Sequence, residues 1–221
     1  MPITSTSPGN HITNAVEYKG ESLRFPFVFI SPVSYNEDVT MKVIAIVGMT
    51  GAGKSEVAKL FAENGFSKIR FGDVTDKEIK KRGLELNEAN ERRIRELLRK
   101  EQGMAAYAKL NLPMIDSALK MSDVVIDGLY SWEEYVFLKG HYGESFAVVA
   151  VWASPKTRYT RLTSRQLRGL TKEDAASRDK AEIENINKGG PIAMADFTIL
   201  NEHFLDDLEK EVTKVISWLR E

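Results

Sequence analysis

A glycine-rich stretch, GMTGAGKS, occupies residues 48–55 and fits the pattern G-x-x-x-x-G-K-[ST]. Glycine lets the backbone turn with positive φ and lets its N–H groups approach phosphate oxygens, because no Cβ stands in the way. Lys54 is expected to reach the β and γ phosphates of a nucleotide, and the Ser55 hydroxyl is an oxygen ligand of the kind that Mg²⁺ prefers. An apolar run, VIAIV, precedes the stretch and a helical pattern follows it, which is the context this chemistry requires. The residues expected to contact the phosphates are Gly48, Met49, Thr50, Gly51, Ala52, Gly53, Lys54 and Ser55.

Two acidic residues follow predicted strands. Asp127 ends the apolar run VVID, and an acid at the carboxyl end of a parallel strand faces the ligand crevice. We therefore expect Asp127 to hold Mg²⁺ with Ser55, directly or through water; the alternative is an acid that serves a turn or a helix cap. Asp73 follows the second strand and is expected to contact a phosphate acceptor as a base or a hydrogen-bond partner. Its alternative role is to cap the next helix.

A basic segment lies between residues 156 and 180, with eight basic and three acidic residues. Four of its arginines recur every three or four residues, which predicts one helical face. Phosphoryl transfer needs cations over the migrating group, and a mobile lid that carries arginines would supply them and exclude water. The alternative is a solvated helix face. The arginines of this segment are Arg158, Arg161, Arg165, Arg168 and Arg178.

A second charged segment, ERRIRELLRK, covers residues 91–100. Its spacing predicts a helix with Ile94, Leu97 and Leu98 facing inward. The arginines of this helix are expected to be solvated, and the alternative is that they meet a phosphate on the acceptor.

Alternating strand and helix patterns predict a three-layer α/β domain. Strands that read as continuous apolar runs are buried on both faces, so the sheet is expected to be parallel. The strands are predicted at residues 42–47, 67–71, 123–127, 146–152 and 197–200. The helices are predicted at residues 54–63, 73–82, 87–101, 103–120, 131–139, from 155, 172–187 and 204–220. In the last helix an inward stripe is expected from Phe204, Leu205, Leu208, Val212, Val215, Ile216 and Leu219.

The overall composition restricts the function. The chain has 221 residues, 43% of them hydrophobic, which is enough for one domain with a sizeable core. A net charge of −1 gives no electrostatic case for a nucleic-acid or membrane partner. Without cysteine the chain can form no disulfide, thiolate nucleophile or thiolate metal site. No apolar run approaches the roughly 18 residues of a membrane helix, so we expect a cytoplasmic protein, either a monomer or a homodimer.

Residues 1–40 differ from the rest because Ser, Thr, Pro and Gly interrupt them and no helical period appears. They are expected to be an irregular extension, either translated from an upstream start, with Met41 as the functional start, or a real accessory segment. The run FPFVFI, residues 25–30, could add an edge strand.

From Met41 onward the chain resembles the nucleoside monophosphate kinase group of P-loop kinases, which includes adenylate kinase and dephospho-CoA kinase. The features that carry the resemblance are VGMTGAGKS, FGDV after the second strand, VVIDG after the third and ASPKTRYTRL after the fourth. ADFTILNEHFLDDLEKEV is similar to the end of dephospho-CoA kinases. The first motif is specific for the superfamily but not for the substrate, whereas the order and spacing of the others are fairly specific.

The resemblance implies a P-loop NTPase fold with a five-stranded parallel sheet, ATP as donor, Mg²⁺, and a lid near residues 156–180 over the phosphates. By position, Arg161, Arg165 and Arg178 match lid arginines of the family, Asp127 its strand-end acid and Asp73 its acceptor-side acid.

Two departures concern the acceptor. Where adenylate kinases carry an arginine shortly after the Gly-Asp of the second strand, this chain has Asp76. Where they carry another after the third strand, it has residues 129–131, Leu-Tyr-Ser. Bidentate arginine is hard to replace as a phosphate clamp. Either the acceptor is not an ordinary nucleoside monophosphate, or an arginine of the charged segment substitutes; the candidates are Arg92, Arg93, Arg95 and Arg99.

Two functions follow from these patterns. The first is an ATP-dependent phosphotransferase that acts on a nucleotide-like small molecule, of the nucleoside monophosphate or dephospho-CoA type. The second is a regulator that binds or slowly hydrolyses ATP without an acceptor. A GTPase is not expected, because Asn187-Lys188 is followed by Gly189-Gly190 rather than by the x-Asp that specifies guanine.

Overall fold

The computed structural model describes residues 41–166, 169–202 and 204–220. The expected N-terminal extension, residues 1–40, and its possible edge strand lie outside the described residues, and so does Arg168. Within the described ranges, no helix is both long and apolar enough to cross a membrane.

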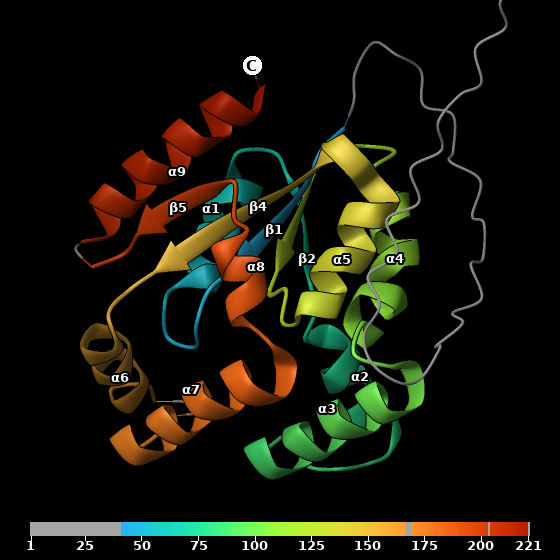
Figure 1. The fold of residues 1–221 in the computed structure, drawn as a ribbon, viewed down its shortest axis with the longest axis vertical. Coiled ribbons are helices and arrows are strands. Elements are labelled where there is room, and N and C mark those ends of the chain that lie inside the picture. The colour runs from blue at the N-terminus through green and yellow to red at the C-terminus, as the bar shows by residue number, and fades with distance from the viewer. Residues whose placement is uncertain (1–40, 167–168, 203, 221) are drawn as a thin grey trace, which may run out of the picture. The chain divides into compact units, whose positions relative to one another are not determined.

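Five strands of the described residues form one parallel sheet in the order β2-β3-β1-β4-β5 (Figure 1). The strands are β1 (Val43–Val47), β2 (Ser67–Arg70), β3 (Val124–Asp127), β4 (Phe146–Trp152) and β5 (Phe197–Leu200). β1 lies in the centre, where Val43 is in register with Val124 of β3 and Phe146 of β4. Every residue of β1 is buried, as its unbroken apolar pattern predicts. The predicted five-stranded parallel sheet is confirmed.

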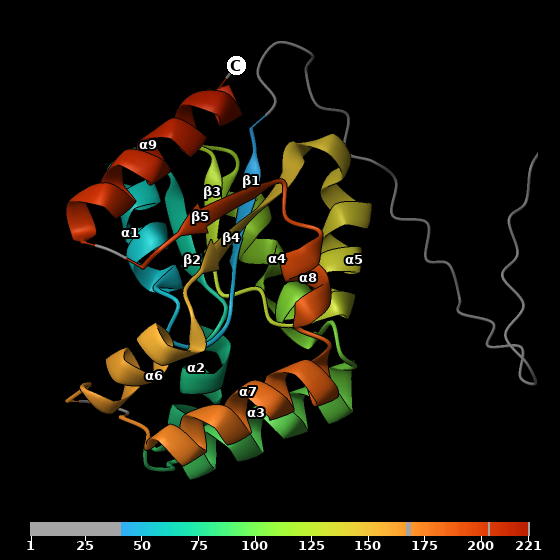
Figure 2. The same ribbon diagram turned by 60° about the vertical axis from the view of Figure 1, so that its left-hand side comes forward.

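Helices cover both faces of the sheet (Figures 1 and 2). α1 (Lys54–Glu63) and α9 (Leu205–Arg220) cover one face, where they pack on Ile44 and Ile46. On the opposite face α4 (Ala106–Ala118) and α5 (Trp132–Tyr142) pack on the sheet, and residues of α2 (Asp73–Lys81) and α3 (Glu88–Gln102) extend the same apolar cluster. Successive strand side chains point to opposite faces, so Val43 and Ala45 belong to this second layer. The remaining helices are η1 (Gly143–Ser145), α6 (Pro155–Thr163), α7 (Lys172–Ile186) and α8 (Gly189–Ala193).

Three details differ from the sequence predictions. The arginines after Pro155 do not share one helical face, because α6 ends at Thr163, before Arg165. The short helix α8 was not predicted, since its sequence, GGPIA, contains two glycines and a proline. The inward stripe of the last helix begins at Leu208, whereas Phe204 and Leu205 are 82% and 49% exposed. These two residues precede the part of α9 that packs on the sheet layer.

The carboxyl ends of all five strands lie at one edge of the sheet, because the strands are parallel. β1 is flanked by β3 and β4, so the chain connections on its two sides run in opposite directions. Ligands of open α/β sheets bind at such a switch point. The glycine-rich loop begins there, directly after Val47.

Candidate functional site

The phosphate-binding loop, residues 48–55, joins β1 to α1. The loop requires glycine at positions 48 and 53. A Cβ on Gly48 would lie 2.3 Å from the Val151 carbonyl oxygen, and one on Gly53 would lie 2.2 Å from Asn201 Nδ2. Helix α1 begins immediately after Gly53, so its N-terminus faces this loop and favours negative charge. The loop glycines with positive φ are Gly48, Gly51 and Gly53, at 141°, 86° and 102°.

Replacing Gly53 by alanine is expected to abolish binding of a nucleoside triphosphate and to destabilise the fold. The new Cβ would collide with Asn201, whose side chain donates to the Ala52 carbonyl over 2.8 Å. Gly65→Ala is the matched control, because its φ of 94° is equally unfavourable to a side chain but no atom lies within 4 Å of the new Cβ. Both variants carry a backbone cost of about 1–2 kcal/mol. Urea denaturation and ATP titration measure the difference; equal losses in the two variants would contradict the steric argument.

Lys54 lies at the start of α1 with its amine turned back onto the loop. Its Nζ donates to the Met49 carbonyl oxygen over 3.0 Å. Burial, and then the neighbouring positive charge of Lys188, lower the pKa of Lys54 to about 7. An anion that entered the loop would offset both effects, so the side chain is placed where a phosphate group would stabilise its charge.

The two residues expected to hold Mg²⁺ are brought together. Ser55 Oγ donates to Asp127 Oδ1 over 3.2 Å, and Lys68 Nζ lies 3.3 Å from Asp127 Oδ2. Among the described residues, no group of three or more His, Cys, Asp or Glu side chains gathers as in a dedicated metal cage. One hydroxyl and one carboxylate fit Mg²⁺, which commonly takes few protein ligands and completes its shell with water and substrate phosphates.

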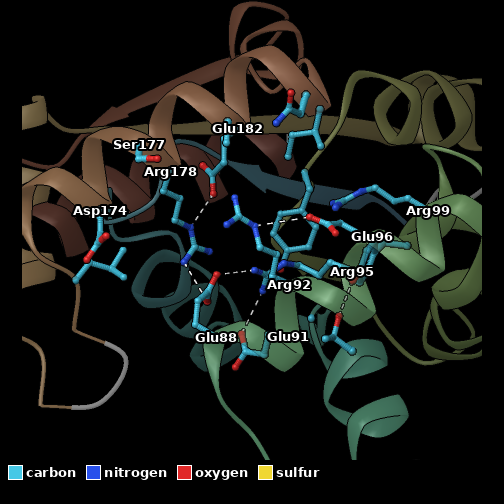
Figure 3. A pocket seen from close by; sticks show the side chains of 18 of the residues that line it. Glu88, Glu91, Arg92, Arg95, Glu96, Arg99, Asp174, Ser177, Arg178 and Glu182 are labelled. Atoms are coloured by element: carbon cyan, nitrogen blue, oxygen red, sulfur yellow. Dashed lines mark hydrogen bonds and ion pairs between the residues drawn. The ribbon is translucent and has the colours of Figure 1, made fainter.

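Two adjoining cavities lie at this edge of the sheet. The loop cavity, about 380 Å³, is lined by residues of the glycine-rich loop and by Asp127. The arginine cavity, about 600 Å³, lies between the α2–α3 side and α7 (Figure 3). The described residues that line both cavities are Arg70, Tyr130, Arg165, Arg178 and Glu182. The sharing of these residues indicates that the two cavities adjoin.

The expected lid arginines have different surroundings. Arg165 and Arg178 line both cavities. Arg161 lies elsewhere, with Nη2 donating to Asn201 Oδ1 over 3.3 Å, and is not among the residues that line either cavity. Arg158 is buried and forms two hydrogen bonds, of 2.8 and 2.6 Å, with the carboxylate of Asp179. Arg158 therefore joins α6 to α7 instead of facing a ligand.

Glu182 and Lys188 join the phosphate-binding loop to α7. Glu182 accepts from Thr50 Oγ1 over 2.6 Å, from Arg178 Nε over 3.2 Å and from Lys188 Nζ over 2.6 Å. Burial opposes the charge of Glu182, but Lys188 and Lys54 hold its pKa below the ordinary value, so it is a carboxylate. Lys188 is 1% exposed and lies with its Nζ 5.7 Å from the centre of the Tyr130 ring. Lys188 is therefore a second lysine in the loop cavity.

Several arginines line the arginine cavity. Arg70 ends β2, and its Nη1 contacts Asp73 and Asp76 over 2.7 Å each. Asp73 is the first residue of α2, after the N-cap residue Gly72, and the lining of the arginine cavity includes Asp76 but not Asp73. Arg93 does not line the cavity either. The α3 arginines that do are Arg92, Arg95 and Arg99.

Sequence reasoning missed four of these residues. Arg70 carried a usable signal, because a polar residue at the carboxyl end of a parallel strand faces the ligand crevice. Asn201 carried the same signal, since it follows β5. Glu182 and Lys188 lie on or near α7, more than 120 residues from the phosphate-binding loop, and no local pattern marks them.

Comparison with known proteins relates the chain to sequence relatives. An AAA domain matches residues 44–189. The UPF0200 protein of Thermococcus kodakarensis is 37% identical over 178 residues, which cover 79% of this chain and 96% of that protein. A UPF0200 protein of Methanosarcina barkeri is 35% identical over 183 residues, with 80% and 95% of the two chains covered.

Solved structures with less than 25% identity share the fold. TT1252 from Thermus thermophilus aligns with a TM-score of 0.58 and 20% identity, covering 81% of this chain and 98% of that chain. Shikimate kinase from Bacteroides thetaiotaomicron aligns with a TM-score of 0.54 and 17% identity, covering 82% and 99%. These likenesses, together with the parallel sheet and the loop after β1, confirm the fold of the P-loop kinases. The chain belongs to the UPF0200 family and carries an AAA domain over residues 44–189.

Proposed function

We propose that this protein is a kinase that transfers the γ-phosphoryl group of ATP to a nucleotide-like small molecule, of the nucleoside monophosphate or dephospho-CoA type. One observation carries the proposal: a cavity at the phosphate-binding loop adjoins a second cavity lined with arginines, and Arg165 and Arg178 line both. A hydrolase needs room only for water beside the nucleotide, whereas a cavity of about 600 Å³ accommodates a second substrate.

In this proposal the loop cavity is the donor cavity, which binds the phosphates of ATP, and the arginine cavity is the acceptor cavity. The N–H groups of residues 48–55 and the N-terminus of α1 surround the phosphates, and Lys54 contacts the β and γ groups. Ser55 and Asp127 would hold Mg²⁺, which supplies neutralisation of phosphate charge when bound. Lys188 adds a second ammonium to the same cavity.

The transfer breaks the bond between the γ-phosphorus and the oxygen that bridges to the β-phosphate, and it forms a bond from that phosphorus to an acceptor oxygen. A phosphate acceptor attacks through an anionic oxygen, whereas a hydroxyl acceptor also gives up its proton to water. ADP leaves with the electron pair of the broken bond. Arg165 and Arg178 lie between the cavities, where charge spreads over the migrating group, and they would stabilise it. The sequence predicts a part in this step for Arg161 and Asp73 as well. Neither residue lines either cavity, so the cavities do not support a role for them in the transfer.

The acidic residues around the acceptor cavity favour a second candidate, a regulator that binds or slowly hydrolyses ATP without an acceptor. Six arginines line this cavity, but six carboxylates line it as well, so its formal charge is balanced. Arg178, for example, lies 3.7 Å from Glu88 across the cavity. Such pairs compete with an anionic acceptor.

The deciding experiment measures ADP release from ATP and Mg²⁺ with a panel of nucleoside monophosphates, deoxynucleotides and dephospho-CoA. We expect one acceptor to raise the rate at least about tenfold above the rate without acceptor, because positioning a second substrate contributes large factors. A slow rate that no acceptor changes would reject the kinase and support the regulator.

A further inference from the structure

The arginine wall of the acceptor cavity comes from two elements. Arg70 ends β2, and the remaining three side chains project from successive turns of α3. The positions where the resembling kinases carry clamp arginines hold Asp76 and residues 129–131 in this chain. Arg165 and Arg178 also line this cavity, but the proposed mechanism assigns them to the migrating phosphoryl group, so the candidates for an acceptor clamp are the arginines of this wall. Its members are Arg70, Arg92, Arg95 and Arg99.

Three of these four arginines already contact carboxylates. Arg70 Nη1 lies 2.7 Å from oxygens of both Asp73 and Asp76. Arg95 contacts Glu88 over 2.7 Å and Glu91 over 3.2 Å. An acceptor anion could use these guanidinium groups only by displacing an acid that is already in place.

Arg92 is the third, and it contacts Glu96 on its own helix over 3.7 Å. Both side chains of this pair are largely exposed, so an anion bound there would compete with water as well as with Glu96.

Arg99 differs from the other three. Among the described residues, no carboxylate lies within 4 Å of its guanidinium group, and its buried Nε has no hydrogen-bond partner. The guanidinium lies over the Tyr107 ring, 5.2 Å from the ring centre. Figure 3 shows Arg99 without a dashed contact to the other side chains drawn, whereas Arg95 and Arg178 both have such contacts.

Tyr107 provides the ring over which the Arg99 guanidinium lies. This ring is fully buried, its hydroxyl forms a hydrogen bond of 2.5 Å with Thr75 Oγ1, and its edge packs on Tyr130 with 5.5 Å between the ring centres. A guanidinium stacked on an aromatic face keeps its N–H edge free for a planar, bidentate contact. Because Nε is buried, a ligand in the cavity would meet the terminal N–H groups of the guanidinium.

We propose that Arg99 is the residue that clamps a phosphate group of the acceptor. The assignment rests on the proposed kinase function, which it deepens by naming the group that replaces the missing clamp arginines. The assignment also describes the acceptor. It carries a phosphate group that contacts Arg99 on the α3 side, and the oxygen that attacks the γ-phosphorus faces the donor cavity. That oxygen belongs either to the same phosphate group or to another group of the molecule.

The test titrates AMP, CMP and dephospho-CoA into the protein with a non-hydrolysable ATP analogue present, so that the donor cavity is filled. Arg99→Gln is expected to weaken the tightest of the three about 10- to 100-fold, since a hydrogen bond to a charged group has that effect. Arg99→Lys keeps the charge but loses the planar fork, and we expect an intermediate loss. Arg93→Gln is the matched control on the same helix, because Arg93 is exposed and does not line the cavity; it should change the affinity less than threefold.

Two results would overturn the assignment. The first is equal acceptor affinity in Arg99→Gln and Arg93→Gln, or no binding of any of the three probes to the unaltered protein. The second is a lower unfolding midpoint in Arg99→Gln with unchanged acceptor affinity. That result would show that Arg99 serves only the buried Tyr107 and the buried Glu134, whose carboxylate it favours electrostatically. Binding is measured without turnover, so Arg99-dependent binding with no phosphoryl transfer would reject the kinase function while leaving the assignment intact.

Discussion

Lys54→Ala is expected to lower kcat/KM for phosphoryl transfer from ATP by at least about 100-fold, the effect of removing a preorganised charge from a developing one. The Lys54 amine is the side-chain cation of the phosphate-binding loop itself. In the free protein its hydrogen bond to the Met49 carbonyl oxygen orients it toward that loop. Lys59→Ala on the same helix is the matched control, because Lys59 is exposed and, among the residues that the structure describes, forms ion pairs with Glu56 and Glu63 alone. Initial rates of ADP release measure both variants. Undiminished turnover in Lys54→Ala would show that Lys54 takes no part in phosphoryl transfer.

The pH dependence of ATP binding tests whether the ammonium form of Lys54 is responsible. The pKa of Lys54 is lowered to about 7 in the free protein, first by burial and then by Lys188. Bound phosphates favour the protonated amine, so ATP binding above pH 7 is accompanied by uptake of a proton. The affinity for ATP should therefore fall by up to about tenfold for each unit that the pH rises. Below pH 7 the amine is protonated in both states and contributes no slope. Titration between pH 7.5 and 9 in two buffers measures this uptake, which should vanish in Lys54→Ala.

Asp179→Ala is expected to lower the free energy of unfolding by about 3–5 kcal/mol, because it leaves the buried charge of Arg158 without its partner. Arg158 and Asp179 are 4% and 9% exposed, and Tyr159 also donates to Asp179 over 3.0 Å. Arg158 further donates to the Thr50 carbonyl over 3.0 Å, so the loss should reach the phosphate-binding loop. Urea denaturation measures the change in stability.

Glu184→Ala provides the control for this loss. Glu184 lies on the same helix, α7, but its pair with Lys180 spans 3.9 Å and is mostly exposed, so the expected cost is below about 1 kcal/mol. The double variant Arg158→Met/Asp179→Leu should be more stable than Asp179→Ala, since it buries no unpaired charge. If Asp179→Ala costs no more than Glu184→Ala, the pair does not stabilise the junction between α6 and α7.

The sequence alone determined the sheet and the phosphate-binding loop, because both depend on neighbours in the chain. The strands β1, β3 and β4 carry continuous apolar runs, and the turn after β1 needs glycines at fixed offsets from Lys54. The position of the acid Asp127 at the end of β3 is predicted by the same local pattern. In the structure Asp127 Oδ1 lies 3.2 Å from Ser55 Oγ.

The helical pattern of the basic segment was misleading for a physical reason. Arginines spaced every three or four residues predict one face only while the helix continues, and α6 ends at Thr163. Charge alone also cannot separate a buried structural arginine from one that faces a ligand. Arg158 became structural because Asp179, 21 residues away, lies opposite it.

Only the tertiary structure decided the surroundings of the two cavities. The contacts of Thr50 with Glu182 and of Ala52 with Asn201 span 132 and 149 residues, and no local pattern encodes such pairs. Arg92, Arg95 and Arg99 look alike in the sequence of α3; what separates them is which carboxylates the folded chain brings within reach. The composition of a segment states how many charges it has, but the packing of distant elements determines which of those charges remain available to a ligand.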